Sequence, residues 1–197
     1  LPETQAFEMM FVREDILADL NLDIPKTWDD VLEAIPVLQA NNMQIGMHTN
    51  YQIFLYQAGG ELYADGGMRI NLDSNVGLES FDTMCSFFTK YSFPYSYNFS
   101  NRFRTGEMPI GFADYITTYN QLKVFATEIE GVWGFYPLPG IADEDGSTIN
   151  NENDWLRFVP EGDGTYKNVF KGTVEEIFKN VYFQSIHGGS PKYSVYN

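Results

Sequence analysis

The segment that decides the fold is Met108-Pro109-Ile110-Gly111-Phe112-Ala113-Asp114-Tyr115-Ile116-Thr117-Thr118-Tyr119, where an apolar run passes into a helical pattern. Residues 108–112 predict a buried strand, and residues 115–129 predict a helix. Asp114 stands between the two, at the position where a carboxylate caps the first turn of a helix. A strand that leads directly into a capped helix is typical of α/β folds.

The same alternation of short apolar runs and capped helices continues on both sides of this segment. Further strands are expected at residues 6–12, 44–48 and 133–138. Thr27, followed three residues later by Asp30, predicts a capped helix start, and Pro36 inside that helix predicts a kink or a split. Because the strands are few and short, the sequence predicts an α/β fold in which helices dominate.

Two other stretches carry strong patterns. A helix that begins at Asp73 or Ser74 is expected to bury a stripe formed by Leu78, Phe81, Met84, Cys85 and Phe88. Aromatic residues then alternate at positions 91, 93, 95, 97 and 99, which predicts an extended stretch with one aromatic face. That face either borders the core or forms a second stacking surface, and we favour the core.

Composition excludes several classes of protein. The chain has 197 residues, with 12 Lys and Arg against 27 Asp and Glu, so its formal net charge is −15. Such a charge disfavours binding to nucleic acid and docking on anionic lipid. A hydrophobic content of 44 % is enough for a buried core, which argues against disorder. Cys85 is the only cysteine, so intramolecular disulfides and cysteine-rich zinc sites are excluded.

Motifs for the common cofactors and for nucleophilic catalysis are missing from the sequence. Neither a dinucleotide-binding nor a phosphate-binding glycine pattern occurs, and His48 and His187 lie far apart in the chain. The acidic residues 143–146 resemble a calcium loop only superficially, so we expect no metal and no cofactor. Glu107, Asp114 and Glu128 flank the strand at residues 108–112 and leave glycoside hydrolysis open as an alternative.

Four motifs follow one another along the chain: a strand and short helix followed by PKTWD at residues 25–29, AGGELY at 58–63, FRTGEMPIG at 103–111 and WGFYPLPG at 133–140. Together they resemble the extracellular solute-binding proteins of bacterial ABC importers, and most of all the sugar-binding family that includes maltose-binding protein. Several motifs in the expected order are far more specific than any one of them.

The resemblance implies a lobe of the type II periplasmic-binding-protein kind, rich in helix and built on a small mixed sheet. Residues 1–146 are similar to the second lobe of these two-lobed proteins. Residues 147–197 match poorly; there we expect a helix near residues 173–184 and a loose tail. The chain starts at Leu1 without an initiator Met and soon enters a predicted strand, so we expect that upstream sequence has been removed. Because complete members of the family have two lobes, the resemblance implies that the first lobe, the signal peptide and the lipid-attachment cysteine are missing.

The resemblance also implies a function. We expect a non-enzymatic monomer that captures a carbohydrate-like solute, an oligosaccharide, and delivers it to the membrane subunits of an ABC permease. The family is extracellular, either as cell-surface lipoproteins or in the periplasm. Two alternatives from other classes stay open, namely a carboxylate-based glycoside hydrolase and a protein-interaction module without a small-molecule site.

By resemblance, two segments line the binding cleft. Their residues are His48, Thr49, Asn50 and Tyr51 in the first segment, and Asp114, Tyr115 and Tyr119 in the second. Both segments leave the carboxyl end of a predicted strand and enter a helix, which is where open α/β sheets place ligands. The alternatives are that Tyr51 covers the core, that Asp114 only caps its helix, and that Tyr115 and Tyr119 form a buried pair.

Overall fold

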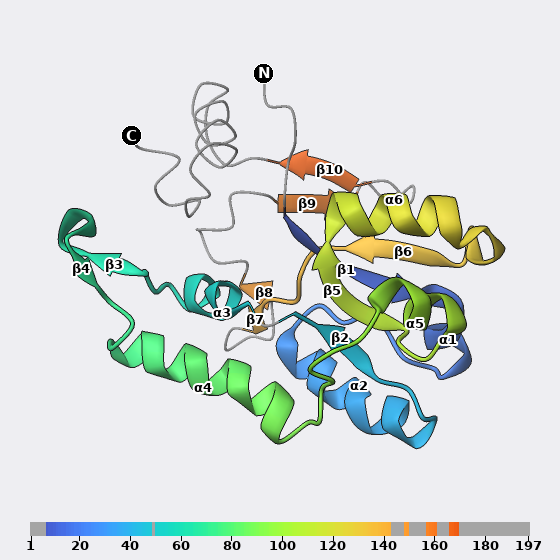
Figure 1. Ribbon diagram of the computed structural model, residues 1–197, viewed down its shortest axis with the longest axis horizontal. Helices are drawn as coiled ribbons and strands as arrows, with labels where there is room; N and C mark the ends of the chain where they lie inside the picture. Colours follow the sequence, from blue (N-terminus) through green and yellow to red (C-terminus); the bar gives the residue numbers. More distant parts are fainter. Residues whose placement is uncertain (1–6, 49, 143–147, 150–156, 161–165, 170–197) are drawn as a thin grey trace. The chain divides into compact units, whose positions relative to one another are not determined.

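The computed structural model describes residues 7–48, 50–142, 148–149, 157–160 and 166–169 (Figure 1). The chain falls into two compact units, one of Leu1–Phe7 with Glu152–Asn197 and one of Glu8–Asn151. In the first unit, strands β9 (Arg157–Pro160) and β10 (Tyr166–Val169) form an antiparallel pair. The predicted helix near residues 173–184, the tail and the acidic residues 143–146 lie outside the described residues.

A four-stranded mixed sheet is the centre of the Glu8–Asn151 unit, with strand order β2-β5-β1-β6. The strands are β1 (Glu8–Arg13), β2 (Ile45–Met47), β5 (Ile110–Asp114) and β6 (Trp133–Tyr136), close to the four predicted ranges. β1 runs antiparallel to β5 and β6, whereas β2 runs parallel to β5. The carboxyl ends of β2 and β5 and the amino end of β1 therefore share one edge of the sheet.

Helices cover both faces of this sheet. One face packs on α2 (Trp28–Ala40), α3 (Tyr51–Gln57) and α4 (Asn75–Thr89), because Met10 and Val12 of β1 join a core cluster with residues of these helices. The other face carries α5 (Phe99–Thr105) and α6 (Tyr115–Phe125). There Phe11 contacts Phe99 and Phe103, with ring centroids 6.1 and 6.5 Å away. The chain therefore forms the predicted α/β fold with a small mixed sheet.

The remaining described elements are short. They are α1 (Glu14–Asp19), β3 (Tyr63–Ala64), the 3₁₀ turn Asp65–Gly67, β4 (Arg69–Ile70), the 3₁₀ turn Thr127–Ile129, β7 (Ile141–Ala142) and β8 (Thr148–Ile149). The β3–β4 hairpin projects away from the sheet at the amino end of α4 (Figure 1). Among the described helices, none combines the length and apolar character that crossing a membrane requires.

Helix α2 begins with the predicted capping box. The Thr27 hydroxyl accepts a hydrogen bond from the Asp30 N–H (3.1 Å), and the Asp30 carboxylate accepts one from the Thr27 N–H (2.8 Å). The helix continues through Pro36 to Ala40 as a single element, so the chain is not split at this proline. Two donors of the first turn are satisfied by this exchange, which stabilises the start of the helix.

Helix α4 buries only the second half of the stripe that the sequence predicts, since Met84 and Phe88 pack against the core and Cys85 is half-buried. Leu78 and Phe81 are 57 % and 54 % exposed, whereas Gly77, Ser80 and Phe87 are buried. The cause is the close approach of neighbouring backbone, since a Cβ atom added at Gly77 would lie 2.5 Å from the Leu72 carbonyl oxygen. In the first half of the helix, Gly77 and Ser80 therefore face inward, and Leu78 and Phe81 are left on the outside.

The aromatic stretch before α5 is not one extended strand with a single face. Phe93 and Phe99 are buried in the core, as favoured, but Tyr95 between them is 81 % exposed. The Asn98 side chain accepts a hydrogen bond from the Asn101 N–H (3.0 Å) and begins α5, a helix that the sequence pattern did not predict. Local capping thus overrides the period-two spacing of the aromatic residues.

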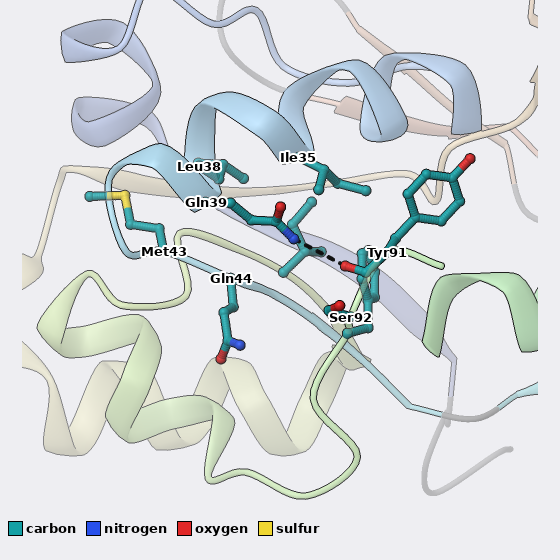
Figure 2. A pocket seen from close by; sticks show the side chains of 9 residues that line it. Ile35, Leu38, Gln39, Met43, Gln44, Tyr91 and Ser92 are labelled. Atoms are coloured by element: carbon teal, nitrogen blue, oxygen red, sulfur yellow. Dashed lines mark hydrogen bonds between the residues drawn. The ribbon is translucent and has the colours of Figure 1, made fainter. Parts of the chain in front are cut away.

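A small pocket lies where α2, β2 and residues 91–93 meet (Figure 2). Ile35 and Leu38 line it from α2, and the Gln39 side-chain amide donates a hydrogen bond to the Tyr91 carbonyl (3.1 Å) across it. Its volume is about 10 Å³, which is about the space of one water molecule. This pocket is therefore a packing gap and not a site for a solute.

Candidate functional site

The parallel pairing of β2 and β5 brings the two predicted site segments to one edge of the sheet. Met47, the last residue of β2, lies opposite Phe112 of β5. His48 and Asn50 follow β2, while Asp114 is the last residue of β5 and Tyr115 begins α6. Thr49 lies outside the described residues. An edge where two parallel strands end and two helices begin is a usual place for a ligand in an α/β sheet.

Asp114 has the capping role that the sequence predicts. Its Oδ1 atom accepts a hydrogen bond from the Thr117 N–H (2.9 Å) in the first turn of α6. The residue is half-buried at the edge of the sheet. Since a carboxylate has two oxygens, capping leaves Asp114 able to accept a hydrogen bond from a solute hydroxyl as well.

Glu8 is a site residue that sequence reasoning missed. It opens β1 and is the direct cross-strand partner of Asp114, so the two side chains project from the same face of the sheet. Its Oε1 atom accepts a hydrogen bond from the Asn50 side-chain amide (3.3 Å). Its Oε2 atom is buried and has no hydrogen-bond partner among the described residues. The sequence feature that could have pointed to Glu8 is that it is the single charged residue in the apolar run of residues 6–12.

The pKa of the Glu8 carboxyl is raised above its ordinary value, first of all because burial disfavours the charged form. The hydrogen bond from Asn50 and the nearby imidazole of His48 oppose this effect, and the negative charge of Asp114 adds to it. A buried carboxyl whose second oxygen is unsatisfied costs folding free energy, and such groups concentrate at functional sites.

Tyr97 lies beside the same edge. Its ring stacks on the exposed ring of His48, with centroids 5.8 Å apart and an interplanar angle of 24°. The Tyr97 hydroxyl is buried without a hydrogen-bond partner among the described residues, and burial together with the charge of Glu8 raises its pKa to about 12. A phenol held in its protonated form is a hydrogen-bond donor over the whole physiological pH range.

Tyr115 and Tyr119 form an aromatic cluster with Phe135 of β6. The two tyrosine rings lie 5.6 Å apart, and the ring of Phe135 lies 4.9 Å from Tyr115 and 5.9 Å from Tyr119. Both tyrosines are half-buried. The two tyrosines pack on Phe135 of the sheet, and part of their ring surface stays exposed near Asp114.

Tyr51 makes contacts away from Asp114. Its hydroxyl donates a hydrogen bond to the Gly77 carbonyl (2.8 Å), and its ring contacts the ring of Phe81 at a centroid distance of 6.1 Å. These contacts attach α3 to α4. A stacking role for Tyr51 in solute binding stays a prediction.

The three carboxylates considered for glycoside hydrolysis do not converge. Glu107 precedes β5 and Asp114 ends it, so they lie at opposite ends of the strand. Glu128 forms an ion pair with Arg104 (3.2 Å). Glu8 and Asp114 do form a close carboxyl pair, but the free oxygen of Glu8 is shielded from solvent and one oxygen of Asp114 caps α6. A hydrolase needs an acid and a second carboxylate that both reach the glycosidic bond.

Two larger hollows lie elsewhere on the Glu8–Asn151 unit. One of about 300 Å³ is lined by Trp28, Phe54, Ser80 and neighbouring residues, and one of about 210 Å³ lies between α5 and α6. None of the predicted site residues lines either hollow. The predicted edge is therefore distinct from these two hollows.

Comparison with known proteins gives a clear family match. The family model described as bacterial extracellular solute-binding protein matches residues 1–166, which extends beyond the boundary near residue 146 predicted from the motifs. No curated protein matches the chain.

Several solved structures share the fold. The maltose-bound MalE3 of T. maritima has a TM-score of 0.63 and 20 % identity, and the match covers 75 % of this chain and 41 % of that one. A solute-binding protein of Thermotoga lettingae bound with alpha-D-tagatose has a TM-score of 0.60 and 21 % identity, covering 71 % and 41 %. The sugar-binding protein MalE of Xanthomonas citri has a TM-score of 0.59 and 15 % identity, covering 94 % and 50 %.

These matches confirm the fold class predicted from the sequence, a helix-rich α/β fold with a small mixed sheet. The chain spans between two fifths and one half of the length of the solved structures that it matches.

Proposed function

Because the chain belongs to the family of bacterial extracellular solute-binding proteins, we propose that it captures a carbohydrate-like solute for an ABC importer. The proposed solute contacts are made by the edge at which β2 and β5 end, with His48, Asn50, Asp114 and Tyr115 as its nearest residues. The proteins of this family bind solutes and deliver them to a transporter. A carbohydrate is the class of solute that we assign to this chain.

The observation that supports this proposal is that hydrogen-bonding groups and aromatic residues stand at the same edge of the sheet, where β2 and β5 end. Asn50 and Asp114 supply an amide and a carboxylate, and Tyr115 with Tyr119 supplies partly open ring surface. Sugars need both kinds of group, because hydroxyls form hydrogen bonds and the C–H face of the ring packs on aromatic rings. The solved relatives with bound maltose and alpha-D-tagatose favour a sugar over other solutes.

The proposal has three further parts. Residues 1–146 act as the second lobe of a two-lobed protein, and the partner of that protein is the membrane part of an ABC permease. The protein works outside the bacterial membrane, as a lipoprotein or in the periplasm. It is a monomer that binds an oligosaccharide and does not hydrolyse it.

Nuclear magnetic resonance of the ¹⁵N-labelled chain tests the proposal, because it detects millimolar binding and locates it. Titration with maltose and longer oligosaccharides should shift the amide signals of His48, Asn50 and Asp114. The variant Asn50→Ala should weaken these shifts. Thr27→Ala is the matched control, since it removes the cap of α2 as Asn50→Ala removes the cap of α3, at a cost of about 1 kcal/mol each.

Shifts confined to another surface would contradict the proposed site, and the absence of any shift with the whole panel would contradict carbohydrate binding. Release of reducing ends during the titration would instead support the hydrolase alternative.

A further inference from the structure

The charges at the proposed site are one-sided. Glu8 and Asp114 are direct cross-strand partners, so two carboxylates meet at the edge where the solute is proposed to bind. Like charges directly opposite each other on a sheet destabilise it, and a protein tolerates such a pair when the site uses the charge.

Among the described residues, neither a lysine nor an arginine is a resolved influence on the Glu8 carboxyl. The charged groups that act on it are His48 and Asp114. The described arginines of the unit have partners elsewhere, such as Asp15 for Arg13 and Glu128 for Arg104. His48 is exposed and stacked on Tyr97, so the imidazole is the one titratable base that faces the pair among the residues described.

The other polar groups at this edge leave the electrostatic balance unchanged. Asn50 donates its amide to Glu8, and the Tyr97 hydroxyl is a neutral donor without a partner among the described residues. A solute at this edge lies beside the Asn50 amide and the Asp114 carboxylate, with the Glu8 carboxyl and the neutral Tyr97 phenol buried beneath them. The Glu8 carboxyl lies beneath the surface, where low polarisability makes its field stronger than that of an exposed acid.

We propose that Glu8, together with Asp114, sets the charge selectivity of the site, so that it accepts neutral and amine-bearing sugars and rejects sugar acids. The inference rests on the proposed function, because it concerns the class of solute bound at the same edge. Glu8 acts through its field and through Asn50 and is therefore a specificity-determining residue without direct contact to the solute.

Three probes of similar size test this selectivity at pH 7 and low salt: glucose, glucosamine and glucuronate. Amide shifts of His48, Asn50 and Tyr115 should show glucosamine binding about threefold more tightly than glucose, and glucuronate about tenfold more weakly than glucose. Raising the salt to about 1 M should compress these ratios, because screening shortens the reach of the carboxylate field.

The variant Glu8→Gln should reduce the difference between glucose and glucuronate to less than about threefold. Glu33→Gln is the matched control, because it removes one acidic charge from an exposed position of α2 and should leave all three ratios unchanged. Circular dichroism of each variant shows whether it is folded. Glucuronate bound as tightly as glucose by the unaltered chain would overturn the inference and leave the proposed function standing.

A second measurement tests the charge selectivity without using a sugar, so it remains informative even if the chain binds no sugar. Two paramagnetic nitroxides of equal size, one bearing an amine and one a carboxylate, broaden amide signals according to the local potential. The amine-bearing nitroxide should broaden His48 and Tyr115 more than the carboxylate-bearing one, and Glu8→Gln should lessen this difference. Equal broadening by both probes would overturn the inference regardless of sugar binding.

Discussion

At the scale of single residues, Glu8 has the most informative environment in the described chain. It opens a strand whose other residues are buried, it shares an edge with Asp114, and its Oε2 atom has no partner among the described residues. Residues that break the local rule of apolar burial without a compensating partner concentrate where a site needs them. The structure therefore directs attention to a residue that periodicity alone treats as the polar end of a strand.

Removing the charge of Glu8 should stabilise the protein at neutral pH. The folded state raises the pKa of this carboxyl above its ordinary 4.5, so the folded protein holds the proton more tightly than the unfolded chain does. The resulting penalty is absent below pH 4.5 and grows as the pH rises through the folded-state pKa. Glu8→Gln should therefore gain about 1 kcal/mol at pH 7 and nothing at pH 4.

Urea denaturation at the two pH values measures this difference. Glu33→Gln serves as the exposed control and should show no such pH dependence, because its side chain is on the solvent side of α2. A loss of stability for Glu8→Gln at pH 7 would show that the charged form is well satisfied in the folded state.

Asp114 combines two roles that paired substitutions can separate. Asp114→Ala removes the cap of α6 and the carboxylate together, so it should cost about 1 kcal/mol of stability and weaken sugar binding by about 1–3 kcal/mol. Asp114→Asn keeps an oxygen that accepts from the Thr117 N–H, so its stability should match the unaltered chain. Denaturation and sugar titration of both variants give the two quantities. Equal stability of Asp114→Ala and the unaltered chain would contradict the capping role.

At the scale of elements, much of the architecture could be predicted because local signals and tertiary packing agree. Thr27 and Asp114 stand where both the sequence and the structure place helix caps, and the four predicted strands form the sheet. The predicted buried face of α4 was wrong for the first half of the helix. Leu78 and Phe81 follow helical spacing yet face outward, while Gly77 beside them is packed closely against the Leu72 carbonyl.

At the site, too, some residues could be predicted from local sequence and others depend on the tertiary structure. Asn50 and Asp114 follow strands in the sequence, so their common edge could be predicted from parallel pairing. Glu8 and Tyr97 reach that edge only through the antiparallel register of β1 and a loop that precedes α5. Neither the register nor the course of a loop is encoded in local periodicity.

A buried amide connects three segments of the fold, and its loss should be costly. Gln57 at the end of α3 accepts a hydrogen bond from the Trp28 indole N–H (2.7 Å) and donates one to the Pro139 carbonyl (2.9 Å). Gln57→Met keeps the volume and leaves both groups without these partners, so stability should fall by about 2 kcal/mol. Gln52→Met at an exposed position of the same helix should change stability by less than about 0.5 kcal/mol. Equal unfolding midpoints of the two variants in urea would contradict a structural role for this network.

At the scale of the whole molecule, the charge and the extent of the chain restrict its partners. The net charge of −15 makes the chain strongly acidic, which favours solubility and opposes polyanionic partners. The chain covers 41 % of two of the solved structures that share its fold. In those structures, the matched part supplies only a portion of the molecule.

The acidic surface should prevent binding to nucleic acid. Neutralising the phosphate charge needs lysine or arginine, and the 12 in the sequence are outnumbered by 27 acidic residues. A gel-shift assay with random duplex DNA at ~150 mM salt should show no complex at micromolar protein. A shift that disappears at higher salt would reveal a basic surface that the overall charge conceals.

The affinity of the chain for sugar should be low, because an open edge buries only part of a solute. Pockets that bind small molecules tightly enclose most of the ligand surface, whereas His48, Asn50, Asp114 and Tyr115 line one side. Each tenfold loss of affinity corresponds to about 1.4 kcal/mol, so the absence of a few hydrogen bonds and one stacking ring places the dissociation constant in the millimolar range. Isothermal titration of the 197-residue chain should therefore give no measurable heat at micromolar oligosaccharide, while magnetic resonance detects binding near 10 mM. A low-micromolar complex of this chain with an oligosaccharide would show that the edge is a complete site, and residues 1–146 would then not act as one side of a two-lobed clamp.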